Sequence, residues 1–412
     1  MAKTKILYLI TSLDQGGAQN SVLTTIKKLD RREFEPYLAA GPGGRLDGKV
    51  KREFKNIYFI SALRHDVRKR YFLHDTLAIL QMGRLMRKIK PQIVHTNAPK
   101  AGILGRIAAR IFWRKAKVIH TFHGLGFARE HGPKHFAFFV KTEKLCASMT
   151  DAMVFVSKKN ASEAAQLGIS GKGIRSEIIR AGIDFDRKLP ANFDPAAKKA
   201  SLKIPATGRV VLAIANFKPL KNPIHFVLAA YKVLGKNKNV YFIYTGDGPL
   251  KEAATNLAKH LGIEKQIIFP GWRGDSDELL AISDVYVSTS LREGIPMSIL
   301  EAQAHRVPAV CYDVDGISEI VTNNRTGFLV KRNDISALAE KITTLLRNHG
   351  LRERFRQNIA KRDFGEFTVP VMLRRQEQLY RALTPQKRRR KFFFRGRHKF
   401  IKRKSNSTRE KK

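Results

Sequence analysis

The sequence predicts an α/β protein made of two Rossmann-like, doubly wound domains that face each other across a cleft. Short apolar, strand-like segments alternate with segments of helical periodicity through about 180 residues, a pattern typical of a parallel sheet covered by helices. The alternation stops between residues 181 and 205, which are rich in turn residues and proline, and starts again at Arg209. A chain of 412 residues is long enough for two such domains.

The first half of the chain supplies the first domain. Apolar runs predict strands at 5–10, 36–40, 57–60, 93–95, 118–122 and 152–156. Helical spacing predicts helices at 18–29, 63–90, 99–110 and 136–150. The apolar positions of the strongly basic second helix are Leu73, Leu77, Leu80, Leu85 and Ile89. The pair Gly16 and Gly17 follows the first strand, and because glycine lets a backbone approach a phosphate closely, this loop is a candidate phosphate site.

The second half repeats the pattern and sets the domain limits. Its expected strands are 209–215, 241–244, 267–269, 285–287, 309–311 and 327–330. We therefore assign residues 1–188 to an N-terminal domain and residues 189–365 to a C-terminal domain. Residues 366–385 are expected to form a helix that crosses back to the N-terminal domain. Residues 386–412 form a basic tail with too little apolar surface to fold alone, so we expect it to be disordered.

The segment 290–302 carries the clearest chemical signal. It holds Glu293 and Glu301 with seven residues between them, a Gly-Ile-Pro turn, and a helix that begins near Met297. A loop between strand and helix lies at the carboxyl edge of a parallel sheet, where open α/β sheets bind ligands. The helix N-terminus favours a phosphate, whereas two carboxylates favour hydroxyl groups. A nucleotide sugar supplies both.

Three further loops reach the same edge of the second sheet. Residues 216–222 offer Lys218 and Lys221, residues 245–249 offer two glycines, and residues 313–319 add a turn. A cation, exposed amides and helix N-termini together suit the growing charge of a diphosphate leaving group. The sequence shows no cluster with the spacing of a metal site. We therefore expect neither a metal nor a cofactor, the nucleotide sugar being a substrate.

These motifs, in this order, resemble those of the GT-B glycosyltransferases of retaining family 4, the group 1 type. The resemblance extends from Lys5 to about Leu383, and residues 290–308 are similar to the family's E-x7-E signature. The other matching segments are 16–19, 120–124, 156–157, 215–222 and 245–249. The resemblance implies a GT-B fold and transfer of a sugar with retention of configuration.

The resemblance also implies roles for individual residues. Lys221 would hold the donor diphosphate, Glu293 would bind sugar hydroxyls, and His123 would lie near the reacting carbon, which makes these three the catalytic candidates. Glu301 would bind the ribose. The donor-binding candidates are Gly16, Gly17, Asn216, Lys221, Gly246, Asp247, Glu293, Gly294, Ile295, Pro296, Met297, Ser298 and Glu301. Many relatives have arginine where this chain has Asn216, so one cation is missing from the phosphate loop.

The charge of the chain is unusual, with 78 basic and 35 acidic side chains and a net charge of +43. Residues 1–190 hold 36 basic and 15 acidic side chains, and residues 386–412 hold 14 and 1, so the excess lies on the acceptor side and in the tail. Such a field favours a polyanionic surface, either anionic lipid or nucleic acid. The membrane-binding candidates are Arg68, Lys69, Arg70, Trp113, Arg114, Lys115, Phe392, Phe393 and Phe394.

The remaining features suggest where the protein acts. The sequence contains no apolar run of about 18 residues, and the run at 6–10 gives way to polar residues too soon for a signal peptide. Cys146 and Cys311 fit reduced core thiols. We expect a cytoplasmic protein, peripheral on the inner face of the cytoplasmic membrane.

The expected function is transfer of a sugar from a nucleotide donor, UDP-linked in our reading, to a lipid-linked acceptor or to an envelope polysaccharide or lipopolysaccharide. Two alternatives stay open. One is a sugar-nucleotide epimerase or phosphorylase of the same fold, which would turn over without an acceptor or with phosphate. The other is a basic protein associated with nucleic acid, because charge alone does not separate RNA from lipid.

Overall fold

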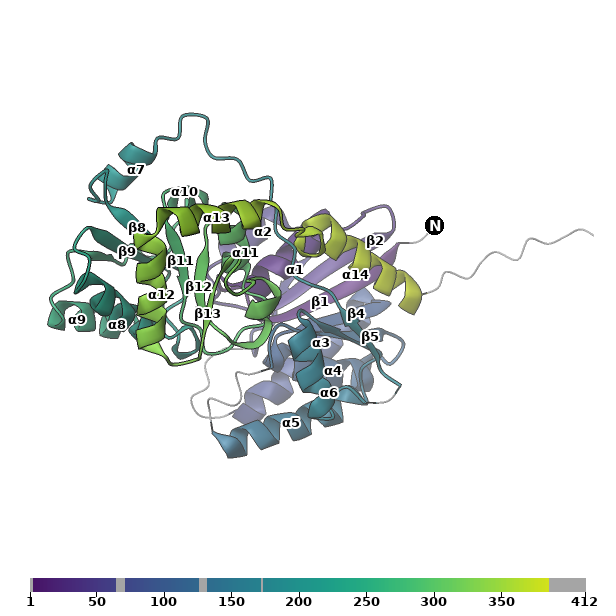
Figure 1. Cartoon of the computed structure of the whole chain (residues 1–412). Coiled ribbons are helices and arrows are strands. Elements are labelled where there is room, and N and C mark those ends of the chain that lie inside the picture. Colours follow the sequence, from purple (N-terminus) through teal and green to yellow (C-terminus); the bar gives the residue numbers. More distant parts are fainter. Residues whose placement is uncertain (1–2, 64–70, 126–131, 172, 385–412) are drawn as a thin grey trace, which may run out of the picture.

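The structure, a computed structural model, describes residues 3–63, 71–125, 132–171 and 173–384. It contains two parallel sheets, each covered by helices on both faces and each forming the centre of its own domain (Figure 1). The predicted α/β class with two Rossmann-like domains is therefore confirmed.

The N-terminal sheet has seven parallel strands in the order β3-β2-β1-β4-β5-β6-β7. They are β1 (Thr4–Ser12), β2 (Phe34–Gly41), β3 (Ile57–Phe59), β4 (Ile93–Asn97), β5 (Lys117–Phe122), β6 (Ala152–Phe155) and β7 (Arg175–Ile178). The central strands are buried on both faces, which explains their nearly continuous apolar runs. The strand order reverses between β1 and β4, and such switch points are where α/β sheets bind ligands.

Helices cover both faces of this sheet. They are α1 (Gly17–Lys28), α2 (Asp47–Glu53), α3 (Tyr71–Ile89), α4 (Pro99–Phe112), α5 (Pro133–Ala147) and α6 (Lys158–Gln166). Residues of α1 and α2 share one apolar core, and residues of α3 and α4 share another. The helix predicted from residue 63 differs from the structure, where Leu63 is non-helical and fully buried in the core beneath α3. Within the described residues that helix begins at Tyr71.

The C-terminal sheet has six parallel strands in the order β10-β9-β8-β11-β12-β13. They are β8 (Arg209–Ile214), β9 (Val240–Thr245), β10 (Ile267–Ile268), β11 (Val285–Ser288), β12 (Ala309–Tyr312) and β13 (Gly327–Val330). The α-helices of this half are α7 (Pro195–Ser201), α8 (Pro223–Leu234), α9 (Lys251–His260), α10 (Ser276–Ala281), α11 (Met297–Ala304), α12 (Ile335–Arg347) and α13 (His349–Ala360). Short 3-10 helices are η2 (Pro219–Lys221), η3 (Asp315–Glu319) and η4 (Gly365–Phe367).

The last helix, α14 (Val369–Leu383), packs against the N-terminal domain (Figure 1). Val369, Met372 and Leu379 join the apolar core beneath α1. The segments that cross between the domains run side by side, since Ile183 N donates to Phe367 O at 2.8 Å. Helix α14 is thereby fixed to the domain that contains β1.

Two smaller expectations concern the cysteines and membrane spans. Cys146 and Cys311 are free and buried, and Cys311 belongs to the apolar core of the C-terminal domain. Within the described residues, no helix combines the length and the apolar character needed to cross a bilayer.

Candidate active site

The centre of the site is an ion pair between two loops at the carboxyl edge of the C-terminal sheet. Lys221, the last residue of η2, places Nζ 2.5 Å from Oε1 of Glu293, which lies in the loop between β11 and α11. The side chains are 24% and 10% exposed, so the pair is largely removed from solvent. The structure thus brings together two of the three catalytic candidates.

The loop that carries Glu293 is braced from both domains. The backbone N–H of Glu293 donates to Oδ2 of Asp315 at 2.7 Å, and Arg292 Nε lies 3.1 Å from the same oxygen. Arg292 also donates through Nη2 to both carboxylate oxygens of Glu163, on α6 of the other domain, at 2.9 and 2.8 Å. Burial raises the pKa of Asp315, and the neighbouring Arg292 opposes that rise. Arg292 therefore links the donor loop to the N-terminal domain.

Gly294 brings the same loop against the N-terminal domain. A Cβ atom built on Gly294 would lie 2.1 Å from the carbonyl oxygen of His123 and 2.8 Å from Cγ2 of Val156. Real Cβ atoms do not approach a backbone oxygen so closely, and only glycine avoids the clash. The third catalytic candidate, His123, therefore sits beside the loop that holds Glu293.

Two helix N-termini meet at this position. Gly16 is the N-cap of α1, and Pro296 is the N-cap of α11, whose first residue is Met297. A Cβ on Gly17 would lie 3.6 Å from Sδ of Met297, so the amino ends of the two helices are close. Ile295 is buried beneath the loop, whereas Ser298 is half-buried in the first turn. Free N–H groups and helix dipoles from both domains favour an anion there.

The phosphate loop after β8 contains the departure noted in the sequence. The neighbouring loop after β9 packs against it: Gly246 has φ +146°, and a Cβ there would lie 1.9 Å from Ala215 O, so this turn requires glycine. Asp247 is exposed and accepts from the Gly248 N–H at 2.9 Å. Asn216 buries its Oδ1 without a partner among the described residues. Because Asn216 carries no charge, it adds no cation to this loop.

Glu301 already has a cationic partner in the structure. Its Oε1 lies 3.3 Å from Nη2 of Arg187, in the linker between the domains, and Arg187 also pairs with Asp277 at 3.1 Å. Burial raises the pKa of Glu301, while the charge of Arg187 opposes that rise. A ligand hydroxyl at Glu301 would therefore share this carboxylate with Arg187.

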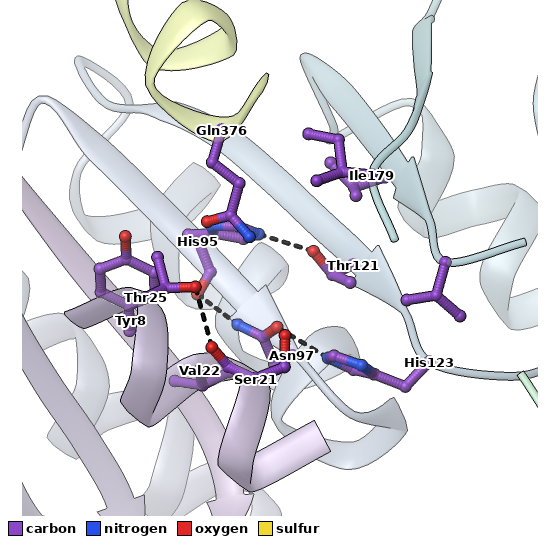
Figure 2. Close-up of a pocket in the computed structure, with 12 residues that line it drawn as sticks. Tyr8, Ser21, Val22, Thr25, His95, Asn97, Thr121, His123, Ile179 and Gln376 are labelled. Atoms are coloured by element: carbon purple, nitrogen blue, oxygen red, sulfur yellow. Dashed lines mark hydrogen bonds between the residues drawn. The ribbon is translucent and has the colours of Figure 1, made fainter. Parts of the chain in front are cut away.

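His123 is held in one orientation by Asn97, at the end of β4 (Figure 2). His123 Nε2 is 3.0 Å from Asn97 Oδ1, and Asn97 Nδ2 donates to His95 O at 3.3 Å. Because this second bond assigns the amide orientation, Nε2 carries the proton and Nδ1 does not. Burial lowers the pKa of His123 to about 4. At neutral pH the imidazole is uncharged.

The structure describes only some of the residues predicted to contact a membrane. Trp113 is half-buried and donates through Nε1 to Pro91 O at 2.8 Å, and this packing leaves it poorly placed to enter a bilayer. Arg114 and Lys115 are exposed. The candidates outside the described residues are Arg68, Lys69, Arg70, Phe392, Phe393 and Phe394. A search of the described ranges finds no group of three or more His, Cys, Asp or Glu side chains arranged to hold a metal ion.

Two facing Rossmann-like domains, with a cation, carboxylates and helix N-termini between them, define the GT-B class of glycosyltransferase. Residues 15–187 match the family model described as Glycosyltransferase Family 4, and residues 194–362 match that of Glycosyl transferases group 1. Together these matches span most of both domains. The chain belongs to the group 1, family 4 glycosyltransferases and is a glycosyltransferase enzyme, as the sequence motifs predicted.

Similar proteins support this assignment. UDP-Gal:alpha-D-GlcNAc-diphosphoundecaprenol alpha-1,3-galactosyltransferase of Escherichia coli is 27% identical over 339 residues, covering 82% of this chain and 86% of that protein. The capsular polysaccharide biosynthesis glycosyltransferase CapM of Staphylococcus aureus is 26% identical over 347 residues, covering 81% and 87%. The crystal structure of Anabaena HepE with UDP and glucose superimposes with a TM-score of 0.78 at 18% identity, covering 92% and 100%, and shows the shared fold.

Four structural partners of the candidates were not predicted from the sequence. They are Asn97, Arg187, Arg292 and Asp315. Arg292 and Asp315 lie within the loops that the motifs identified, so adjacency to Glu293 was the available signal. Arg187 lies in the linker, where turn residues and prolines gave no indication of a ligand-facing side chain.

Proposed function

We propose that this chain transfers a hexosyl residue from a UDP-linked donor to a lipid-linked or cell-envelope glycan, with retention of the anomeric configuration. The observation that carries the proposal is the Lys221–Glu293 pair, which Gly294 holds against the backbone of His123. A cation and a carboxylate of the donor domain thus adjoin the one catalytic candidate of the acceptor domain.

The ion pair suggests how the donor is received. A diphosphate is a stronger anionic partner for the Lys221 ammonium than one carboxylate, because it carries more negative charge. Donor entry would draw Lys221 away from Glu293 and free the carboxylate to accept hydrogen bonds from sugar hydroxyls. The N-termini of α1 and α11 would face the phosphates, where charge grows as the sugar departs.

Neutral His123 would act on the acceptor side as a hydrogen-bonding group. With its proton on Nε2 held by Asn97, its Nδ1 remains an acceptor. Such a group can orient a hydroxyl without adding charge to the site. Glu301 would hold the ribose, with Arg187 keeping its carboxylate ionised against burial.

The choice of donor and acceptor draws on the relatives. Similar proteins are named as a UDP-Gal:alpha-D-GlcNAc-diphosphoundecaprenol alpha-1,3-galactosyltransferase, a capsular polysaccharide biosynthesis glycosyltransferase and a lipopolysaccharide core biosynthesis glycosyltransferase. These names favour a UDP sugar and an acceptor attached to a lipid or to an envelope glycan. We extend the proposal to a position on the inner face of the cytoplasmic membrane, where such an acceptor would be reached.

The test is a screen of UDP- and GDP-sugars for release of the nucleotide, with and without lipid-linked glycan acceptors. We expect release to depend on a UDP-sugar and to increase with an acceptor. The anomeric proton in the NMR spectrum of the product should show retention. Turnover of a UDP-sugar to its epimer without acceptor, or only with inorganic phosphate, would instead favour an epimerase or a phosphorylase.

We expect transfer to proceed without a divalent metal ion. Because Lys221 and the two helix N-termini supply positive charge for the diphosphate, transfer should persist after chelation by EDTA. Loss of transfer that Mg²⁺ restores would contradict this part of the proposal.

The basic tail is proposed to strengthen attachment to anionic lipid. Residues 386–412 hold 14 basic side chains and 1 acidic one, and each basic residue near an anionic surface contributes about 1 kcal/mol. Deletion of residues 386–412 should therefore reduce sedimentation with anionic vesicles. Undiminished sedimentation would refute the tether. Tighter, equally salt-sensitive binding to RNA than to vesicles would favour the nucleic-acid alternative.

A further inference from the structure

Exposed large apolar side chains are concentrated on three helices of the N-terminal domain. Leu73 and Leu77 of α3 are 65% and 52% exposed, and Phe138 and Leu145 of α5 are 71% and 64% exposed. Leu80 of α3 and Ile111 of α4 add to the group. Elsewhere in the described part of the chain, the exposed large apolar residue is Tyr231 of α8. A group of large apolar side chains exposed to solvent marks an interaction surface.

On α3 these side chains form a stripe along the helix. Leu73, Leu77 and Leu80 are spaced by four and three residues, and exposed Arg84 continues the same line. The opposite side of the helix is buried, with Ala78, Met82 and Met86 all at 0% exposure in the domain core. The helix is therefore apolar on two sides, although packing within the domain uses only one.

The outer side of α5 carries a similar stripe of exposed apolar residues, with lysine between them. Phe138, Lys141 and Leu145 are exposed and spaced by three and four residues, whereas Phe139 and Glu143 face the interior. α4 contacts both α3 and α5, so the three helices form one layer on the sheet, visible in Figure 1 on the side of the sheet opposite α14.

Carboxylates do little to offset the positive charge of this layer. From residue 71 to residue 147, the acidic side chains in the described part are Asp75 and Glu143. Asp75 pairs with Lys100 at 2.8 Å, and Glu143 is fully buried against Arg106 at 2.7 Å. The exposed lysines and arginines of α3 and α5 therefore carry positive charge that these carboxylates do not offset, whereas Arg110 of α4 pairs with Asp151 at 2.7 Å. Apolar side chains flanked by Lys and Arg suit the interface of an anionic bilayer.

The orientation of the helices relates this surface to the candidate active site. In a parallel sheet, each crossover helix starts at the carboxyl edge of the strands, and His123 lies at that edge, directly after β5. Leu73 belongs to the first turn of α3 and Phe138 to the second turn of α5, so both lie in the half of the layer nearest the acceptor side, whereas Leu145 lies near the other end of α5.

We propose that the outer surface of α3 and α5, the docking face (Leu73, Leu77, Leu80, Phe138, Lys141 and Leu145), seats the enzyme on an anionic lipid bilayer. The apolar residues enter the headgroup region, and the basic residues contact lipid phosphates. This places the acceptor side of the site at the membrane surface, and in that respect it rests on the proposed lipid-linked acceptor.

The test uses the full chain and vesicles of phosphatidylglycerol and phosphatidylcholine in equal parts. The double variant Leu77→Glu, Phe138→Glu puts two charges on the apolar part of the docking face without touching the core. Its matched control is Tyr231→Glu, which puts a charge on an exposed apolar position of the other domain. A second pair is Arg84→Glu, Lys141→Glu against Lys232→Glu, at an exposed position of α8. UDP affinity, measured for every variant, shows that the donor site is intact.

We expect the double variant to lower vesicle partitioning by about tenfold or more, and the charge reversal by about as much. The two controls should bind vesicles as the unmodified chain does. Unchanged partitioning of Leu77→Glu, Phe138→Glu would overturn the proposal and leave the tail as the anchor. An equal loss in Tyr231→Glu would also overturn it, because any added negative charge would then suffice. Vesicle binding needs no turnover, so failure of every sugar nucleotide to react would refute the proposed function without affecting this result.

Discussion

Gly294 of the donor loop lies so close to His123 that a Cβ atom on it would be 2.1 Å from the histidine carbonyl oxygen. The two domains therefore meet at the position where donor and acceptor candidates adjoin. This contact involves backbone on both sides, so no rotamer change can relieve added bulk.

The first prediction concerns this contact. Gly294→Ala should lower kcat/KM by about a hundredfold, because the methyl group forces the donor loop away from His123 and misplaces the reacting groups. The control is Gly274→Ala, where an added Cβ meets nothing within 4 Å. Steady-state kinetics give kcat/KM for both variants. Equal activity of Gly294→Ala and the unmodified enzyme would show that the contact is dispensable.

Lys221 should matter more than its place in an ion pair suggests. Lys221→Ala removes the cation assigned to the diphosphate and leaves Glu293, 10% exposed, without its partner. We expect a loss of about a hundredfold or more in kcat/KM. Lys232→Ala, at an exposed position of the same domain, should retain full activity. If both variants behaved alike, the diphosphate would have to bind elsewhere.

The pH dependence of activity tests the state of His123. Burial lowers its pKa to about 4, so it stays neutral as the pH falls from 8 to 5 and should produce no acid limb near 6.5. Asn97→Asp places a carboxylate beside Nε2, which favours the protonated ring and raises the pKa of His123. An acid limb should then appear at higher pH in the profile of kcat/KM. A limb near 6.5 in the unmodified enzyme that His123→Asn removes would contradict this account.

The C-terminal helix should contribute measurably to stability through one hydroxyl group. Tyr380 donates to Gln376 Oε1 at 3.0 Å and lies 2.9 Å from Tyr8 Oη and 2.8 Å from His95 Nδ1, all buried. Tyr380→Phe leaves these groups unsatisfied and should lower the free energy of unfolding by about 2 kcal/mol. Denaturant titration compares it with Tyr231→Phe, at an exposed position of α8, for which no loss is expected. Equal stability of the two variants would show that the network is not required.

Much of the fold could be predicted from local patterns. Strands such as β1 and β8 are buried on both faces, so each shows as an apolar run in the sequence. The loop that carries Glu293 could also be predicted from the sequence, because the Gly-Ile-Pro turn and Glu301 lie within one short segment. Lys221 could be assigned to the same edge, since strand ends in a parallel sheet share that edge.

The contacts between domains could not be predicted in this way. Arg292 and Glu163 are separated by 129 positions, and no spacing rule relates them. The apolar stripe of α3 shows a second limit. Periodicity indicated that Leu73, Leu77 and Leu80 share one side of a helix, but it could not say that the sheet covers the other side. Only the packing of α3 on the domain reveals which apolar side remains exposed.

Calorimetry measures directly whether the C-terminal domain binds a nucleotide-sugar donor. The experiment compares the UDP affinity of the unmodified chain with that of Glu301→Ala. Glu301 lies 3.3 Å from Arg187 and is largely buried, and in our proposal its carboxylate accepts hydrogen bonds from the ribose hydroxyls. We expect measurable UDP affinity in the unmodified chain and a loss of about a hundredfold or more in Glu301→Ala, since the variant also leaves Arg187 without this partner. Equal UDP affinity in the two proteins, or no binding by the unmodified chain, would contradict it.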